Sequence, residues 1–326
     1  MKAVYIKEFG GIEQLALEDV PDPPSPEGTQ VVVNVRAAGL NRADIIQRMG
    51  KYPPPPGYSP NIPGLEFAGK VASVGSEVVL YKPGDRVFGI TAGEAQAEYL
   101  TVDETLLARI PENLDFVEAA AVPEVFITAH DAVFTQCGLR PNEWILIHAV
   151  GSGVGLAALQ LAKANGAYTA GTSRTKDKLD RCHEFGLDLP LLTPEPVFAA
   201  AVNGRTGSGA NVILDLVGGN YFPENLQSLA VKGRMILVGL TAGRTSEIDL
   251  AMGLYKRAKI IGTTLRARSI DEKAGTTKKF VDEVIPLFES GKISPNLEKV
   301  FPAAEIQAAH TYLESNKSFG KIVIEF

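Results

Sequence analysis

The chain has 326 residues, of which 45% are hydrophobic and 21% are charged, and its formal net charge is −6. This length exceeds what one ordinary hydrophobic core organises, so we expect two domains. No apolar run reaches membrane-spanning length, the N-terminus has no signal-peptide core, and there is no long basic run. Two cysteines, Cys137 and Cys182, exclude a disulfide framework and a cysteine-rich zinc site. We therefore expect a cytoplasmic protein with no membrane or nucleic-acid partner.

The first third of the chain has the pattern of short strands separated by turns. Residues 31–36 are largely apolar, and PGLEFAGKVASVG followed by YKPGDRVFGI predicts strands joined as hairpins. One helix is expected at residues 41–49, before the stiff proline-rich loop GKYPPPPG. Residues 1–122 therefore predict a β-rich, barrel-like domain.

From residue 116 onward, helical and strand patterns alternate. Residues 116–134 are predicted to be helical apart from Pro123, and the apolar run Trp144–Val150 predicts a buried strand. Further strands are expected at 167–171, near Leu189, in ANVILDLVGG and in RMILVGL, with helices at 156–165, 176–185 and 221–230. This order predicts an α/β fold, in which residues 123–263 form a doubly wound parallel Rossmann sheet. A helix at 272–289 and the final strand GKIVIEF have no core of their own, so we expect residues 264–326 to return to the first domain.

A glycine-rich turn joins the strand at Trp144 to the following helix. Its residues are Gly151, Ser152, Gly153, Val154 and Gly155. Glycines at this junction allow the backbone to approach a pyrophosphate closely and bring the helix N-terminus against it. The pattern favours dinucleotide binding; the alternative is a tight strand-to-helix connection without a ligand.

The end of the second Rossmann strand indicates which dinucleotide is bound. NAD-binding units place an acid there, about 20 residues after the glycines, whereas this chain has Gly171-Thr172-Ser173-Arg174. Hydroxyls at Thr172 and Ser173 could donate to a 2′-phosphate, and Arg174 and Lys178 would share one helical face if the helix begins early enough. We therefore expect NADPH; the alternative is that both cations are ordinary solvated charges.

Several motifs together resemble one known family. AGLNRADIIQRMGKYPPPPG, PGLEFAGKV, GDRVFG, HAVGSGVGLAALQLA, ILDLVGG and GKIVIEF resemble the zinc-independent quinone oxidoreductases of the medium-chain dehydrogenase/reductase superfamily, over essentially the whole chain. The four-proline loop, VPEVFITA and TTLRARS are most similar to its tumour-suppressor-inducible subgroup. The resemblance implies a GroES-like catalytic domain, a Rossmann domain that binds NADPH, a quinone-like acceptor and a homodimer.

The zinc alcohol dehydrogenases of the same superfamily differ at two places. They carry a cysteine ligand in the stretch matching AGLNRAD and a four-cysteine lobe near residue 90, and neither is present here. Without a Lewis acid, alcohol oxidation loses its usual mechanism. Hydride transfer to an electron-poor acceptor stays open, because the nicotinamide supplies the hydride and the protein mainly positions the reactants.

Candidate catalytic residues lie around the proline-rich loop. Tyr52 could cap the nicotinamide and hydrogen-bond the acceptor oxygen, or it could simply pack on neighbouring prolines. Asn41 lines the active site by resemblance, although capping of the following helix is an equal alternative for Asn41 and Asp44. We expect Glu66 to order the turn beneath the site, and His148 to be a core histidine rather than an acid. No catalytic dyad or triad is visible.

The resemblance also implies cofactor contacts outside the glycine turn. Thr128 matches a position whose hydroxyl reaches the cofactor, the alternative being a hydroxyl bonded back to its own helix. The other implied contacts are Gly239, Leu240, Leu265, Arg266, Arg268, Asn316, Phe319 and Lys321. Arg268 could equally be solvated. Where relatives carry an Asn-Tyr pair, this chain has Leu192-Thr193, so one adenosine-side contact is in doubt. Two other functions stay open: an enoyl-thioester or enal reductase, and a non-catalytic NADPH-binding protein.

Overall fold

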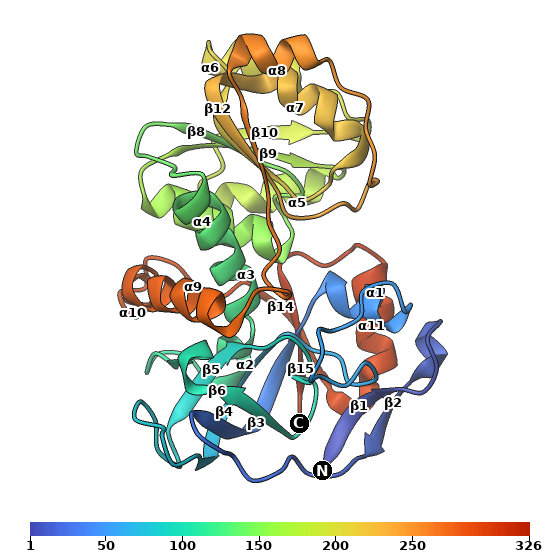
Figure 1. The fold of residues 1–326 in the computed structure, drawn as a ribbon. Coiled ribbons are helices and arrows are strands. Elements are labelled where there is room, and N and C mark those ends of the chain that lie inside the picture. Colours follow the sequence, from blue (N-terminus) through green and yellow to red (C-terminus); the bar gives the residue numbers. More distant parts are fainter. The chain divides into compact units, whose positions relative to one another are not determined.

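The computed structural model describes residues 1–326 and divides into two compact units. The first unit combines Met1–Ile127 with Leu265–Phe326, and the second is Thr128–Thr264. Both chain termini lie in the first unit (Figure 1). The last segment of the chain therefore returns to the fold that the first residues begin.

The first unit is built on antiparallel strands. Its seven-stranded sheet has the order β14-β15-β3-β4-β5-β7, with β6 paired to β3, and β1 and β2 form a separate hairpin. The strands are β1 (Lys2–Ile6), β2 (Leu15–Asp19), β3 (Gln30–Leu40), β4 (Glu66–Val74), β5 (Arg86–Ile90), β6 (Tyr99–Asp103), β7 (Leu107–Arg109), β14 (Leu297–Pro302) and β15 (Lys321–Glu325). The antiparallel pairing of β4 with β5 confirms the expected hairpin. Apolar residues that alternate along these strands, such as Val31, Val33 and Phe67, form the core.

Five helices lie wholly within the first unit. They are α1 (Arg42–Arg48), α2 (Phe116–Ala120), α9 (Ile270–Glu283), α10 (Ile285–Glu289) and α11 (Ile306–Glu314). The single helix expected at 272–289 is wrong: it is divided into α9 and α10 because Pro286 has no backbone N–H to continue the hydrogen-bond ladder. Another helix, α3 (Pro123–His130), begins at Pro123, where the missing N–H costs nothing, and continues into a π-helical segment, Asp131–Gln136.

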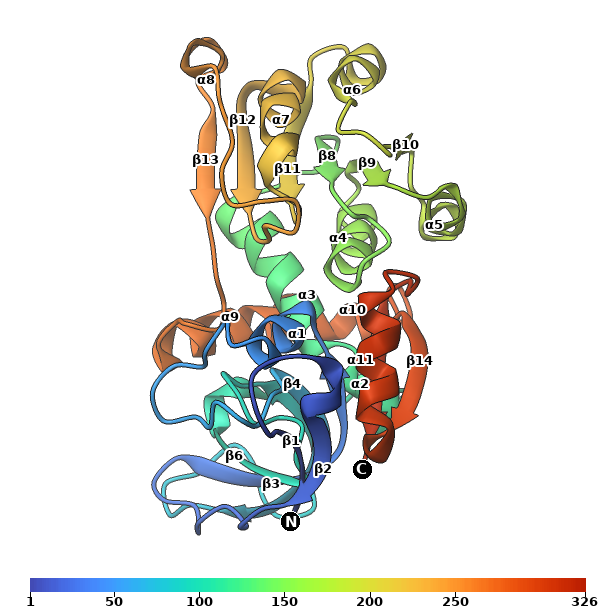
Figure 2. The same cartoon turned by 90° about the vertical axis from the view of Figure 1, so that its right-hand side faces the viewer.

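The second unit contains one parallel sheet with the order β10-β9-β8-β11-β12-β13 (Figure 2). The strands are β8 (Trp144–Ile147), β9 (Tyr168–Ser173), β10 (Leu189–Leu192), β11 (Ala210–Asp215), β12 (Leu229–Leu237) and β13 (Lys259–Gly262). This is the strand order of a Rossmann fold, with the order reversing between β8 and β11. The expected fold class, a Rossmann sheet plus a β-rich GroES-like domain, is confirmed.

Helices connect the parallel strands of this unit. They are α4 (Gly153–Ala164), α5 (Lys176–Cys182), α6 (Ala199–Thr206), α7 (Phe222–Ser228) and α8 (Leu250–Lys256). The strand expected to reach Val150 ends at Ile147, because the chain turns at Ala149, which has a left-handed φ of 48°. The helix expected to reach Ala230 ends at Ser228, because β12 already begins at Leu229.

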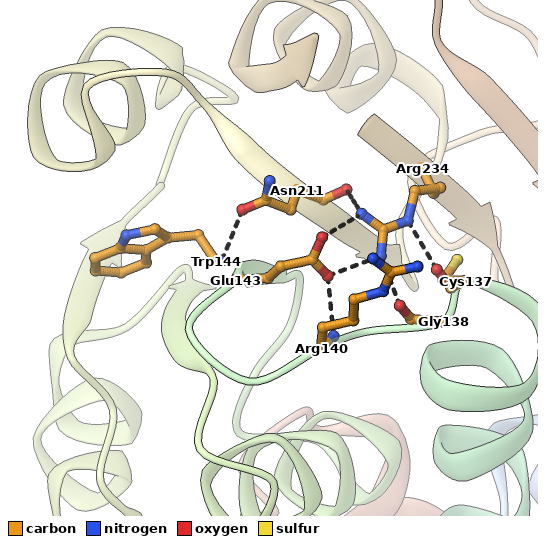
Figure 3. Close-up of polar contacts among 7 residues, drawn as sticks. All are labelled: Cys137, Gly138, Arg140, Glu143, Trp144, Asn211 and Arg234. Carbon is orange, nitrogen blue, oxygen red and sulfur yellow. Dashed lines mark hydrogen bonds and ion pairs between the residues drawn. The ribbon is translucent and has the colours of Figure 1, made fainter. Parts of the chain in front are cut away.

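Arg234 on β12 binds residues 137–143, the segment that leads into β8 (Figure 3). Its guanidinium donates to the carbonyl oxygens of Cys137 (2.7 Å) and Gly138 (2.8 Å), and it forms an ion pair of 2.8 Å with Glu143. Burial raises the pKa of the Cys137 thiol to about 11, so the sulfur stays protonated. The planar guanidinium, whose N–H donors have fixed directions, suits these backbone and carboxylate acceptors.

Candidate active site

The glycine turn of the second unit places α4 against β8. Ser152 is the N-cap, and its hydroxyl oxygen accepts from the backbone N–H of Gly155 (3.2 Å). A Cβ at Gly155 would lie 2.5 Å from the carbonyl oxygen of Ala149, so only glycine allows this approach. Helix α4 therefore begins at Gly153, earlier than expected. Its first amides point out of the helix without intrahelical partners, which suits an anion.

The residues at the end of β9 differ in whether their side chains are free to bind a ligand. Ser173 accepts from the amide of Thr175 and keeps its hydroxyl proton, and Arg174 is exposed with no hydrogen-bond or ion-pair partner. Helix α5 begins at Lys176, so the expectation that Arg174 shares a helical face with Lys178 is wrong. Lys178 lies in the first turn of α5. Arg174 is therefore the free cation at this strand end.

The Thr172 hydroxyl is hydrogen-bonded to His148 inside the second unit. The Asn225 amide donates to Asp215 (2.9 Å), which orients its oxygen toward His148 Nε2 at 2.6 Å. Because Nε2 faces an amide oxygen, it must carry the ring proton. Burial lowers the pKa of His148, so the ring is neutral and Nδ1 accepts from the Thr172 hydroxyl at 3.0 Å. His148 is thus a satisfied core histidine, as expected. The expectation that Thr172 donates to a phosphate is wrong, because its hydroxyl proton is already committed.

A buried ion pair organises the first unit below α1. Lys321 Nζ donates to Glu66 (2.5 Å), to Asn41 Oδ1 (2.9 Å) and to the carbonyl oxygen of Leu40 (2.8 Å). Asn41 Nδ2 in turn donates to Glu66 (2.8 Å). The expectation that Lys321 contacts the cofactor is wrong, because all three of its donors are occupied inside this unit. The Asn41 side chain serves this network, whereas Asp44 accepts from the Asn41 amide at 2.7 Å.

Tyr52 is held in the proline-rich loop by a buried arginine. Arg266 is only 4% exposed, and it donates to the carbonyl oxygens of Tyr52 (2.9 Å) and Ala92 (2.7 Å) and to the Gln47 amide oxygen (2.5 Å). Its guanidinium carbon lies 4.8 Å from the centre of the Tyr52 ring. Three of its five N–H donors therefore hold this loop and its neighbours, and a contact of Arg266 with the cofactor stays a prediction. Burial raises the pKa of Tyr52, and its hydroxyl has no hydrogen-bond partner within the chain.

Two charged residues that the sequence did not single out belong to the same cluster. The backbone N–H of Glu124, in the first turn of α3, donates to Glu66 Oε2 at 2.8 Å. Burial, reinforced by the Glu66 carboxylate, raises the pKa of Glu124 to about 8. Lys273 of α9 is buried, and this burial lowers its pKa. A glutamate in the first turn of a helix is common, so no local pattern singles out Glu124.

Comparisons with known proteins agree on the family. The description "Alcohol dehydrogenase GroES-like domain" matches residues 27–112, and "Zinc-binding dehydrogenase" matches residues 153–283. A quinone oxidoreductase-like protein 2 homolog from Nematostella vectensis is 33% identical, with 99% of this chain and 88% of the relative covered. The chain is an oxidoreductase of the medium-chain dehydrogenase/reductase superfamily and belongs to its quinone oxidoreductase family.

Solved structures of this superfamily extend the likeness. The Escherichia coli quinone oxidoreductase complexed with NADPH has a TM-score of 0.89 and 28% identity, with both chains covered completely. The CurK enoyl reductase has a TM-score of 0.87 and 25% identity, with 99% of this chain and 98% of that chain covered. Membership of the tumour-suppressor-inducible subgroup stays a prediction.

The other residues implied by family resemblance lie in varied settings. Thr128 is partly buried in α3, Leu240 is exposed just beyond β12 beside Gly239, and Leu265 is buried. The remaining three behave as follows: Arg268 donates to Thr276 (3.1 Å), Asn316 accepts from Arg42 (2.6 Å), and Phe319 is buried. Thr193, at the departure from the family pattern, is buried and bonded to Tyr221 (3.2 Å). Their contacts with a cofactor stay predictions.

Two structural findings bear on metal and membrane binding. No group of three or more His, Cys, Asp and Glu side chains is placed to hold a metal ion. None of the helices combines the length and the apolar content needed to cross a membrane.

Proposed function

We propose that this protein is an NADPH-dependent reductase of quinones or similar electron-poor acceptors and that it works without a metal. The observation that carries the proposal is Tyr52, whose free hydroxyl is held in a rigid loop by Arg266, in a unit without a metal-ligand cluster. The second unit, with its glycine turn and free Arg174, would hold NADPH. The relationship to quinone oxidoreductases, one of them solved with NADPH, supports the same reading.

The two units would have separate roles in binding the cofactor and the acceptor. NADPH, when bound, supplies the hydride. The amides at the start of α4 and the Ser173 hydroxyl would bind phosphate oxygens, and Arg174 would pair with the 2′-phosphate. In the first unit, the Tyr52 hydroxyl would donate a hydrogen bond to the acceptor oxygen as negative charge develops there. Asn41, Glu66 and Lys321 would keep the floor of this site rigid.

A second candidate function is reduction of enals or enoyl thioesters. It is favoured by the similarity to the CurK enoyl reductase and by a carboxyl group, Glu124, that stays protonated at neutral pH. A third alternative, a protein that binds NADPH without catalysis, requires only the second unit.

One assay panel tests these functions. The purified protein is incubated with NADPH or NADH and with ortho-quinones, para-quinones, enals or enoyl thioesters, after treatment with a chelator. We expect NADPH oxidation with quinones and undiminished activity in the chelator. NADPH binding without turnover of any acceptor would leave the non-catalytic alternative. Loss of activity in the chelator, together with about one zinc per chain by metal analysis, would contradict metal independence.

The proposal includes a cytoplasmic homodimer formed through the Rossmann sheet edge. Strand β13 is the last strand of its sheet, so its outer edge is unpaired. Apolar side chains on or near it are exposed: Leu250 (76%), Leu254 (72%), Tyr255 (76%) and Ile260 (46%). Such an edge and patch suit pairing with a second copy. Sedimentation of the wild type and of an Ile260→Lys variant tests the dimer, and cell fractionation tests the location.

A further inference from the structure

A chain of buried hydrogen bonds joins the ends of three neighbouring strands of the second unit. Asp215 ends β11, His148 follows β8, and Thr172 lies near the end of β9. All three residues are buried. In a sheet of this strand order, a dinucleotide binds outside the carboxyl ends of the strands, where the order reverses. The hydrogen-bonded chain therefore lies at the edge of the sheet that carries the glycine turn.

The direction of each hydrogen bond in this chain follows from the Asp215 carboxylate, which can only accept. Asp215 accepts from two backbone amides of the turn after β11 (both 2.8 Å) and from the Asn225 side chain (2.9 Å). The Asn225 oxygen then accepts from His148 Nε2, and His148 Nδ1 is left to accept from Thr172. The Thr172 hydroxyl therefore directs its proton at His148, and its lone pairs stay available to another donor.

That donor is the residue at which the glycine turn begins. The Thr172 hydroxyl oxygen accepts from the backbone N–H of Ala149 (3.3 Å), and its carbonyl oxygen accepts from that of Val150 (3.0 Å). Ala149 has a φ of 48°, a left-handed conformation that a residue with a Cβ keeps only where its surroundings hold it. The Ala149 carbonyl oxygen accepts from the N–H of Ser152 (2.8 Å), the N-cap of α4. Thr172 thus holds the residue that sets the course of the turn.

Two aromatic rings keep the His148 side chain in place. The ring centres of Phe198 and Tyr221 each lie 5.0 Å from the centre of the imidazole, and Tyr221 meets it edge-on at 83°. An imidazole bound at both nitrogens cannot rotate without breaking both hydrogen bonds. The orientation of the Thr172 hydroxyl is therefore fixed before any ligand binds.

We propose that Thr172 is a positioning residue for dinucleotide binding: oriented by His148, it holds the glycine turn in the conformation that binds the pyrophosphate. The inference rests on the proposed function, because it takes the turn to be the pyrophosphate site. The pyrophosphate is common to NADPH and NADH, so the Thr172 hydroxyl supports the binding of both cofactors. Arg174, in contrast, supports NADPH alone.

Thr172→Val tests the inference, because valine keeps the shape of threonine but has no hydroxyl. The dissociation constants of NADPH and NADH, measured by nicotinamide fluorescence, should both rise by about tenfold, since the turn loses one neutral hydrogen bond and is held less firmly. Thr172→Ser keeps the hydroxyl and should bind both cofactors within about twofold of the wild type.

Amide hydrogen exchange gives a second readout that needs no cofactor. In the cofactor-free protein, peptides that cover residues 149–155 should exchange faster in Thr172→Val than in the wild type, because the Ala149 amide loses its acceptor. Thr169→Val is the matched control. Thr169 is a buried threonine near the start of the same strand, and its hydroxyl donates to Asp188 (3.0 Å). Its loss should change neither exchange in the turn nor the affinity for either cofactor.

His148→Gln extends the test to the next residue of the chain. Glutamine can still donate to Asn225, but it places no acceptor where Nδ1 lies, so the Thr172 hydroxyl is no longer oriented. We expect the same loss for both cofactors and the same faster exchange as in Thr172→Val. The double variant should lose no more than either single variant, because both changes act through one hydrogen bond.

The outcomes separate the inference from the proposed function. Wild-type affinities and wild-type exchange in Thr172→Val would overturn the inference. A loss of NADPH affinity alone would also overturn it, since it would indicate a contact with the 2′-phosphate, and so would equal losses in Thr172→Val and Thr172→Ser. Wild-type protein that binds neither cofactor contradicts the proposed function, whereas the exchange comparison still decides whether Thr172 holds the turn.

Discussion

Arg174 is the exposed cation directly after β9, and it has no ion-pair partner, although Lys176 two residues later pairs with Asp180 at 2.6 Å. A charge-assisted contact with the 2′-phosphate contributes roughly 1.5–3 kcal/mol, so Arg174→Ala should weaken NADPH binding by about ten- to a hundredfold and leave NADH nearly unchanged. Fluorescence titration measures both affinities. Lys176→Ala is the matched control and should change neither. Equal losses for the two cofactors in Arg174→Ala would contradict the phosphate contact.

Arg266 acts on the proposed acceptor site through Tyr52. Arg266→Met keeps most of the side-chain volume but removes hydrogen bonds to Tyr52, Ala92 and Gln47. We expect the loop around Tyr52 to be cleaved faster in limited proteolysis, and kcat/KM for quinone to fall by about tenfold or more because the hydroxyl is less well placed. Arg266→Lys should not restore activity, since one ammonium cannot span these acceptors.

The control for this prediction lies two residues further along the chain. Arg268→Met should leave the loop protected, because it removes a hydrogen bond to Thr276 of α9. If Arg266→Met retains both wild-type proteolysis and wild-type kinetics, Arg266 does not position Tyr52.

At the scale of elements, the Arg234–Glu143 pair joins β12 to the segment before β8. Its side chains are 15% and 21% exposed, and Arg234 also binds three backbone carbonyl oxygens. Arg234→Ala should lower the free energy of unfolding by about 3 kcal/mol, because it leaves a half-buried carboxylate and several acceptors without donors. Denaturant unfolding measures this change. Lys176→Ala, which breaks an exposed pair, should cost less than about 0.5 kcal/mol; equal effects would contradict the anchoring role of Arg234.

Element boundaries show what local pattern encodes and what it does not. The alternation of apolar runs with helical segments correctly predicted strands β8 to β12 and helices α4, α5 and α7 of the Rossmann unit, because periodicity reflects which face of an element is buried, but it did not predict α6 or α8. Its ends were less predictable. Ala230 suits a helix, yet it lies in β12, which begins with the pairing of Leu229 with Ala210 of β11. Pro286 was a local signal that divides a helix, and the expected long helix neglected it.

At the scale of the whole molecule, stability should pass through a maximum with pH. Glu124 and Asp44 have folded-state pKa values raised to about 8 and about 6, so their contributions are present at low pH and are lost as the pH rises through those values. His310 has a pKa lowered to about 3 by burial and by Arg48, so its contribution is lost as the pH falls below about 6.5. The thermal midpoint, measured from pH 4 to pH 9, should therefore be highest at intermediate pH.

On the alkaline side of this profile, the change in stability with pH reports on Glu124. Glu124→Gln should be more stable than the wild type at pH 9, by on the order of 2 kcal/mol after allowance for the solvent that reaches this side chain, because glutamine has no charge to bury. The two proteins should approach each other near pH 5. A difference that does not change between pH 5 and pH 9 would show that Glu124 does not titrate in the raised range.

The sequence by itself determined the fold class, the family and the absence of cysteine ligands, because strand and helix periodicity, the glycine turn and residue types are local properties of the chain. It also indicated Tyr52 and Arg174 as candidates, because a tyrosine in a proline-rich loop and a cation after a strand are local features of the chain. Only the tertiary structure decided how the charged residues are used. Lys321 meets Glu66 across 255 positions, and Arg266 meets Gln47 across 219. Burial, pairing and pKa depend on such distant neighbours, so no local pattern could show that Lys321 and Arg266 make these contacts or that the pKa of Glu124 is raised.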